Sequence, residues 1–156
     1  MKALTLTQPW ASLVAIGAKC IETRCWSTPY RGPLAIHAAK GFPGWAQRMC
    51  ESEMIRHALV SGGEAVAEPK SSLPRSAILC ISNLVDCLPM EAYRCLPGVF
   101  DEYPNLDTPE ERAFGDYDVF DSENGKRRWA WVLEDTKVFT VPVVTAGALG
   151  LWEWRA

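Results

Sequence analysis

Apolar and polar residues alternate along several short segments, and this period of two predicts β-strands. Three such segments lie in the first 40 residues, at 2–6, 20–26 and 33–40. Further along the chain, the pattern predicts a buried strand at 76–88, one or two strands within 128–144 with DTK as a possible turn, and a last strand at 148–154. About six short strands are therefore expected.

Two or three helices are expected between these strands. WASLVAI follows Thr7, a residue suited to capping, and Pro9, which is favourable at an early helical position, and it ends at Gly17. A longer helix is predicted over about 44–60, before a Gly-Gly pair, and a short one in PMEAYRCL. Strands and helices in this order indicate an α+β fold with a closed or partly closed β-barrel.

Charge is distributed unevenly along the chain, although the formal net charge is only -3. Residues 1–48 carry six Lys or Arg and one acid, whereas residues 98–125 carry nine acids and one Arg. The first segment suits a partner such as nucleic acid. The acidic stretch 98–126 has no sustained period and is expected to be a long loop with one helical turn at 108–112, where TPEE supplies a cap and early acids.

Composition narrows the class of protein further. A chain of 156 residues with 48% hydrophobic residues can bury the core of one domain. Six cysteines without a C-x-x-C spacing, and only two histidines, favour free thiols in the cytoplasm and no metal or other cofactor. Polar residues interrupt the N-terminal apolar stretch, so we interpret it as folded domain and not as a signal peptide, and no segment reaches the roughly 18 apolar residues of a membrane span.

Residues 4–40 carry a more specific signal. LTLTQPWASLVAIGAKCIETRCWSTPYRGPLAIHAAK resembles the ASCH (activating signal cointegrator homology) domain, in which QPWASL is followed by G-x-K-x-x-E-x-R and W-x-T-x-x-R-G-x-L-x-I. The later segments LVDCL, WAWVLED and GLWEW resemble the remaining strands of that family. The resemblance implies a small PUA-like β-barrel of about six strands flanked by two or three helices. It also implies one ASCH domain over 1–156, with 98–126 as an acidic loop insertion.

The same resemblance implies a cleft lined by the G-x-K-x-x-E-x-R segment and an interaction with RNA or another nucleic acid. One branch of small bacterial ASCH proteins hydrolyses the amide of N4-acetylcytidine with a Lys, a Thr and a downstream Glu. Lys19 matches the Lys of that branch, but Glu22 stands where it has the Thr. The acidic residues around Asp101 and Glu102 lie where the downstream Glu is expected.

Lys19, Glu22 and Arg24 are the first candidate site residues. Strand alternation places Glu22, Arg24 and Trp26 on one face and Thr23 on the other. Lys19 and Glu22 could form a rim ion pair of little energetic weight. Alternatively, Glu22 accepts a proton while Lys19 positions an anionic group, and the pair is catalytic. Arg24 could hold Glu22 or meet a phosphate or a base edge.

Basic residues interleaved with aromatic residues suit unpaired bases and their phosphates. Trp10 and His37 are expected to be structural. The predicted nucleic-acid-binding residues are Gln8, Lys19, Glu22, Arg24, Trp26, Tyr30, Arg31 and Lys40.

Three functions remain open on the sequence. The first is a nucleic-acid-binding domain, with RNA as the partner and a cleft for one nucleotide. The second is a hydrolase that acts on a modified nucleoside or on RNA, with Lys19 and Glu22 as the catalytic pair. The third is a protein-interaction module that uses the acidic loop.

Overall fold

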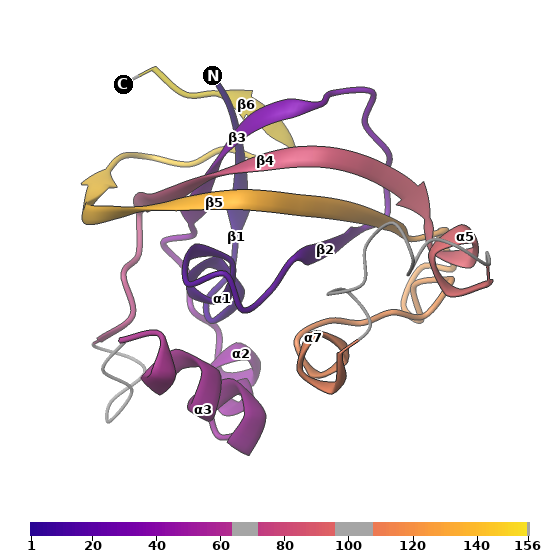
Figure 1. Cartoon of the computed structure of the whole chain (residues 1–156), viewed down its shortest axis with the longest axis horizontal. Coiled ribbons are helices and arrows are strands. Elements are labelled where there is room, and N and C mark those ends of the chain that lie inside the picture. Colours follow the sequence, from indigo (N-terminus) through magenta and orange to yellow (C-terminus); the bar gives the residue numbers. More distant parts are fainter. Residues whose placement is uncertain (64–71, 96–107, 156) are drawn as a thin grey trace.

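The fold is one six-stranded sheet, curled into a half-barrel around a helix (Figure 1). The computed structural model describes residues 1–63, 72–95 and 108–155. The strand order is β2-β5-β4-β3-β1-β6, and β1 and β3 are the parallel pair in a sheet that is otherwise antiparallel. The strands are β1 (Lys2–Leu6), β2 (Ile21–Arg24), β3 (Gly32–Ala38), β4 (Ala77–Pro89), β5 (Trp129–Val144) and β6 (Leu151–Glu153).

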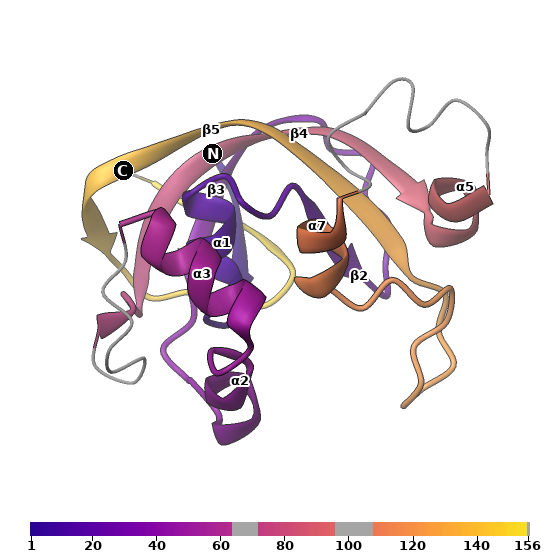
Figure 2. The ribbon, with the colours of Figure 1, turned by 60° about the horizontal axis from the view of Figure 1, so that its bottom comes forward.

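Five short helices are found in the described part of the chain, where two or three were expected. They are α1 (Trp10–Ala15), α2 (Gly44–Met49), α3 (Glu53–Ser61), α5 (Met90–Cys95) and α7 (Pro109–Ala113). Figure 2 shows α1 under the curved strands β4 and β5, with α2 and α3 on one side of it and α7 on the other side, near β2. None of the helices in the described residues has the length and apolar character needed to cross a membrane.

Two packing clusters hold this arrangement together. Val14 and Ala15 of α1 pack into the concave face of the sheet, against residues such as Leu34 and Trp131. Leu13, one position earlier on α1, packs the other way, against α2, α3 and the end of α7. Because α1 is buried on both sides, the short helices are fixed to the sheet through it.

The single helix predicted over 44–60 is wrong, because the chain turns after α2. Ser52 has an extended backbone (ψ 130°) and precedes α3. The break lets Ala46 of α2 and its C-cap residue Cys50 pack into the same buried cluster as Ile55 and Leu59 of α3. Burial of these four apolar side chains outweighs the continuity of the helix.

Two local predictions are also corrected. The helix α1 begins at Trp10 with Pro9 as its cap residue, so Thr7 does not cap it with its side chain. DTK is not a turn but a β-bulge within the continuous strand β5. Lys137 pairs with Ile81 and Glu134 pairs with Asn83, which leaves two residues of β5 opposite one of β4. The φ of +50° at Asp135 accommodates this extra residue.

The turn of helix predicted at 108–112 is confirmed. In α7 the Thr108 hydroxyl accepts a hydrogen bond from the Glu111 backbone N–H, and Pro109 follows the cap. The first part of the acidic stretch, up to residue 107, lies outside the described residues. From Thr108 onward the chain leads back towards the start of β5, and Phe120 forms an isolated bridge with Arg127.

Candidate functional site

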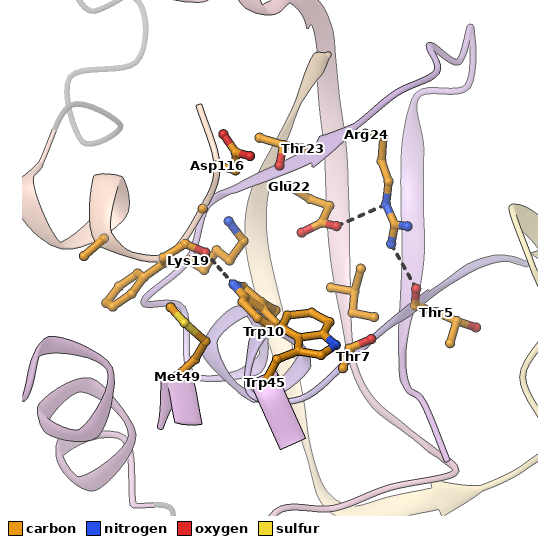
Figure 3. Close-up of a pocket in the computed structure, with 14 residues that line it drawn as sticks. Thr5, Thr7, Trp10, Lys19, Glu22, Thr23, Arg24, Trp45, Met49 and Asp116 are labelled. Carbon is orange, nitrogen blue, oxygen red and sulfur yellow. Dashed lines mark hydrogen bonds and ion pairs between the residues drawn. The ribbon is translucent and has the colours of Figure 1, made fainter. Parts of the chain in front are cut away.

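A cleft of about 380 Å³ opens beside the short edge strand β2 (Figure 3). Its walls come from β1, β2, α1, α2 and the end of α7. The volume falls within the range of about 300–1,000 Å³ that is usual for small-ligand sites. The lining residues are Thr5, Leu6, Thr7, Trp10, Lys19, Glu22, Thr23, Arg24, Trp45, Met49, Ala113, Phe114, Gly115 and Asp116.

One wall of the cleft is aromatic. The rings of Trp10 and Trp45 have centroids 5.6 Å apart at an interplanar angle of 40°. The Trp10 indole N–H donates to the Phe114 carbonyl at 2.6 Å, which ties α1 to the end of α7. Trp45 is 55% exposed, whereas large aromatic side chains are usually mostly buried. Sequence analysis missed Trp45, and the signal that could have found it is a Trp beside glycine and proline at the start of a helix.

The opposite wall is polar. Glu22 and Arg24 form an ion pair, with Arg24 Nε 3.1 Å from Glu22 Oε1, although the Nε–H is not aligned for a hydrogen bond. Arg24 Nη2 also donates to the Thr5 carbonyl at 2.9 Å, so it connects β2 to β1 across the open side of the half-barrel. Thr23 lines the cleft as well, although alternation placed it on the other face. Figure 3 shows these polar groups facing Trp10 and Trp45.

Lys19 lines the cleft, and it pairs with Glu111 beneath the surface of the cleft; both side chains are buried. Lys19 Nζ is 3.7 Å from Glu111 Oε1, and the two side chains are 1% and 2% exposed. The same Nζ lies 5.6 Å from the centroid of the Tyr117 ring and has no hydrogen-bond partner among the described residues. The expected pairing of Lys19 with Glu22 is therefore corrected: Lys19 pairs with Glu111, and Glu22 pairs with Arg24.

Glu111 is engaged by its surroundings. Its carboxylate accepts hydrogen bonds from the backbone N–H groups of Cys20 (2.6 Å) and Ile21 (3.1 Å) and from the Tyr117 hydroxyl. An ionised carboxylate offers about four acceptor positions. The three bonds occupy three of these positions, and Lys19 Nζ lies near the carboxylate without a hydrogen bond to it. Glu111 therefore fixes the start of β2 and places a negative charge beside Lys19.

The carboxylate that lies beside Lys19 belongs to Glu111, which is in the predicted helical turn at 108–112. Asp101 and Glu102, where a downstream Glu was expected, lie outside the described residues. Sequence analysis noted Glu111 only as an early acid of that turn, because a helix-start acid is ordinarily solvated. Nothing in the local sequence distinguishes it from its neighbour Glu110, which is exposed.

The thiols beside the cleft are not suited to be nucleophiles. Burial raises the pKa of the Cys20 thiol to about 11, and the neighbouring Glu111 carboxylate adds to this effect. Burial and the Asp121 carboxylate also raise the pKa of Cys25. Both cysteines stay protonated at neutral pH, and the thiol is the unreactive form. In the described part of the chain no three His, Cys, Asp or Glu side chains are grouped in a way that could hold a metal ion.

Two of the other predicted binding residues have structural contacts away from the cleft. Gln8 is buried, donates to the Ser12 hydroxyl and the Pro74 carbonyl, and accepts from the Ser12 N–H. Trp26 packs edge-to-face on Trp131, with ring centroids 4.6 Å apart, and its carbonyl accepts from the Trp131 indole N–H.

The remaining three predicted residues also lie outside the cleft. The Tyr30 hydroxyl donates to the Pro33 carbonyl. Arg31 forms an ion pair with Asp86 at 2.8 Å. Lys40 is exposed and lines two further hollows described below. Of the eight predicted residues, the cleft therefore brings together Lys19, Glu22 and Arg24.

The described end of the acidic stretch makes its own ion pairs. Arg128 contacts the carboxylates of Asp116 and Asp121. Asp116 also lines the cleft, so the acidic residue at its rim is compensated by a neighbouring cation. The charged groups of the cleft are consequently matched: Lys19 with Glu111, Arg24 with Glu22, and Arg128 with Asp116.

Comparison with known proteins adds independent evidence. A model of the ASCH domain matches residues 4–141. Activating signal cointegrator 1 of Mus musculus is 32% identical over 111 residues, which are 71% of this chain and 17% of that protein. The Homo sapiens protein of the same name is 31% identical over 111 residues, with the same two shares. The chain thus spans less than a fifth of the length of these relatives.

Solved structures show the same fold. ASCH from Zymomonas mobilis superposes with a TM-score of 0.55 at 13% identity, and the match covers 99% of this chain and 87% of that one. A Tyr-to-Phe mutant of the same protein gives a TM-score of 0.53 at 12% identity, covering 99% and 89%. At such low identity the likeness concerns the fold alone.

Proposed function

Because the chain belongs to the ASCH domain family, which is generally linked to RNA binding, we propose that it binds single-stranded RNA and holds one base in the cleft. The base lies against Trp45 and faces Glu22 and Arg24. This is the first of the three functions that the sequence left open. The cytoplasm is the proposed location, as the free cysteines suggest.

One observation carries the proposal: an exposed tryptophan faces a charged polar pair across a space of small-ligand size. Single-stranded nucleic acids are held by aromatic side chains on which bases stack, and each stacked base contributes about 1–3 kcal/mol. Trp45 provides such a surface because it is 55% exposed and is supported from behind by Trp10. The Glu22 carboxylate, on the opposite wall, can accept hydrogen bonds from an exocyclic amine or a ring N–H of the base.

The electrostatics of the cleft also favour a base over a phosphate. Each cation at its wall has a carboxylate as neighbour: Lys19 has Glu111 and Arg24 has Glu22. Such a site carries little net positive charge, and phosphate binding depends on excess positive charge. A neutral base with hydrogen-bond donors fits these groups better.

Binding is tested with a panel of labelled single-stranded RNA and DNA oligonucleotides of mixed sequence, measured by fluorescence anisotropy at about 50 mM salt, where backbone contacts are strong. We expect salt-sensitive binding of RNA by the wild-type protein. In Glu22→Gln, we expect about tenfold weaker binding of oligonucleotides rich in amine-bearing bases, since one charged acceptor is lost.

The matched control is Glu110→Gln, the same change at an exposed residue of α7. It is expected to bind as the wild type does. If no oligonucleotide is retained at low salt by the wild-type protein, the proposal is wrong. Equal effects of the two substitutions would remove Glu22 from the binding site.

A hydrolase is the second candidate, and the buried amine of Lys19 at the back of the cleft favours it. In this reaction the amide C–N bond of an N4-acylated cytidine breaks, water adds to the carbonyl carbon, and cytidine and a carboxylic acid are released. Lys19 would stabilise the oxyanion. Because the Glu111 side chain is buried and Glu22 is the carboxylate that lines the cleft beside Arg24, Glu22 is the group that would take the proton from water.

Mass spectrometry of N4-acylated cytidines and short RNA after incubation with the protein distinguishes the two candidates. A binding protein returns every compound unchanged. A hydrolase yields cytidine or shorter RNA, and Lys19→Met, which keeps the length of the side chain without its charge, abolishes that product. Circular dichroism of the variant checks that it remains folded.

A further inference from the structure

Two further hollows lie on the same part of the molecule, and one of them shares Thr5 with the cleft. A hollow of about 570 Å³ lies between the ends of β1 and β3 and residues 144–149. Thr5 lines both this hollow and the cleft. Its carbonyl accepts from Arg24 on the cleft side, while its hydroxyl donates to the Ala148 carbonyl on the other side. Thr5 therefore lies between the two cavities, with its carbonyl on one side and its hydroxyl on the other.

The third hollow, of about 520 Å³, is formed by Lys40 and residues 72–76. It shares Lys40 and Ser76 with the second hollow. We call the second and third hollows together, with lining residues that extend from Thr5 to Lys40 and Arg75, the basic track.

The charges of the basic track differ from those of the cleft. Among the described residues, no Asp or Glu lines either hollow of the track. Lys40 and Arg75 are exposed, and in the described part of the chain neither has a carboxylate within ion-pair distance. In the cleft, by contrast, Lys19 and Arg24 are paired with carboxylates. The unpaired positive charge thus lies outside the cavity that suits a base.

This separation matches the chemistry of a nucleic-acid strand. A nucleotide within a strand combines an uncharged base with phosphodiesters that carry one negative charge each. Phosphate contacts fix the position of the strand, whereas contacts to base edges select the base. The cleft, in which each cation is paired with a carboxylate, suits the base. The basic track, where Lys40 and Arg75 are unpaired among the described residues, suits the phosphates.

We propose that the sugar–phosphate backbone next to the bound base runs past Thr5 along the basic track, with its phosphates at Lys40 and Arg75. The inference rests on the proposed function and narrows it: the ligand is an oligonucleotide, not a free nucleoside. Lys40 and Arg31 are both among the nucleic-acid-binding residues predicted from the sequence. Of the two, Arg31 forms an ion pair with Asp86, and Lys40 lines the track.

The test compares the double variant Lys40→Ala/Arg75→Ala with the control Lys137→Ala/Arg56→Ala. Each removes one Lys and one Arg that are exposed in the structure, so the change in net charge is identical. Affinity for a labelled RNA hexamer is measured by anisotropy over a salt series, and affinity for the matching mononucleoside by calorimetry. A third variant, Ala146→Trp, fills the track at an exposed position without a change of charge.

We expect Lys40→Ala/Arg75→Ala to bind the hexamer about tenfold more weakly at low salt and to lower the slope of log affinity against log salt by about 1.4, which corresponds to two phosphate contacts on a single strand. Mononucleoside affinity should stay at the wild-type value. Ala146→Trp should weaken hexamer binding alone.

The outcomes separate the two proposals. If the control pair lowers hexamer affinity as much as the track pair, or if Ala146→Trp has no effect, the proposed path of the backbone along the basic track is wrong. The proposed binding of a base in the cleft is not affected by either result. If the wild-type protein binds neither hexamer nor mononucleoside, the proposed function fails and the track fails with it. If the track variants also bind the mononucleoside more weakly than the wild type does, the base and the phosphates do not occupy separate sites, and the proposal is wrong.

Discussion

Lys19 Nζ lies 3.7 Å from Glu111 Oε1, and both side chains are almost completely buried. The two residues are far apart in the sequence, and their contact joins the start of β2 to helix α7. A buried charge that loses its partner is strongly destabilising, typically by about 3–5 kcal/mol. The stability of the cleft therefore depends on this pair.

Replacement of Glu111 by Gln should lower the free energy of unfolding by about 3 kcal/mol, because it leaves the Lys19 ammonium buried without an opposite charge. Urea denaturation followed by tryptophan fluorescence measures the effect. Glu110→Gln, at the exposed neighbouring position, should change stability by less than about 0.5 kcal/mol. A second change, Lys19→Met, should restore part of the stability of Glu111→Gln. Similar midpoints for the two Gln variants would show that the pair is not a stabilising contact.

Replacement of Trp45 by Ala should weaken the binding of single-stranded RNA about 10- to 100-fold, the loss expected for one stacked base. Stability should change little, because the side chain is 55% exposed. Phe120→Ala removes an aromatic side chain that is 54% exposed and lies outside the cleft, so it serves as the control. RNA affinity that is equal in the two variants would contradict the stacking site.

Stability should decrease when the pH falls through about 6.5, and His37 is one cause. Burial lowers the pKa of His37 below its ordinary value of 6.5. Its Nε2 must carry the proton, because it lies 3.1 Å from the Thr145 carbonyl, which can only accept. Nδ1 has no hydrogen-bond partner in the part of the chain that the structure describes. The unfolded chain therefore binds a proton at a higher pH than the folded protein does. The free energy of unfolding should lose up to about 1.4 kcal/mol per pH unit in this range.

Urea denaturation between about pH 7.5 and 5.5 measures this dependence. His37→Gln, which keeps a donor for the Thr145 carbonyl, should flatten it. His57→Gln, the same change at an exposed residue of α3, should retain the wild-type slope. A steep slope in His37→Gln would assign the effect to other groups.

Gly147→Ala should destabilise the protein by about 1–3 kcal/mol through overpacking. A Cβ at this position would lie 2.4 Å from His37 Cε1 and 2.9 Å from Thr5 Oγ1. Both are held in place, His37 by burial and Thr5 by its hydrogen bond to the Ala148 carbonyl. Gly41→Ala is the control, because its Cβ would have no atom within 4 Å. Thermal unfolding with equal midpoints for the two variants would contradict the close packing at Gly147.

The sheet was predictable because its strands carry their own pattern. Alternation located β1 and β3, and a continuous apolar run located β4, since these signals arise within a few residues. The break between α2 and α3 was not predictable, because it depends on packing against Leu13 and Phe114, which are distant in sequence. The bulge at Asp135 escaped prediction for a similar reason, since it exists only through the register with β4.

The cleft was predictable where the residues are close in sequence. The motif from Lys19 to Arg24 pointed to the correct strand, and all of Lys19, Glu22 and Arg24 line the cavity. The partner of Lys19 was not predictable, because nothing local distinguishes Glu111 from Glu110. Trp45 was also missed, since its exposure follows from where α2 is held by the buried cluster and not from its own neighbours in the chain.

The attachment of β2 has a practical consequence for shortening the protein. Within the described residues, this four-residue strand pairs with β5 alone. Glu111 holds the backbone N–H groups at its start, those of Cys20 and Ile21. The acidic stretch 98–125 therefore cannot be trimmed as one dispensable unit. Removal of residues up to 107 spares the anchor of β2, whereas removal of the whole stretch also takes away Glu111 and leaves the floor of the cleft without its support.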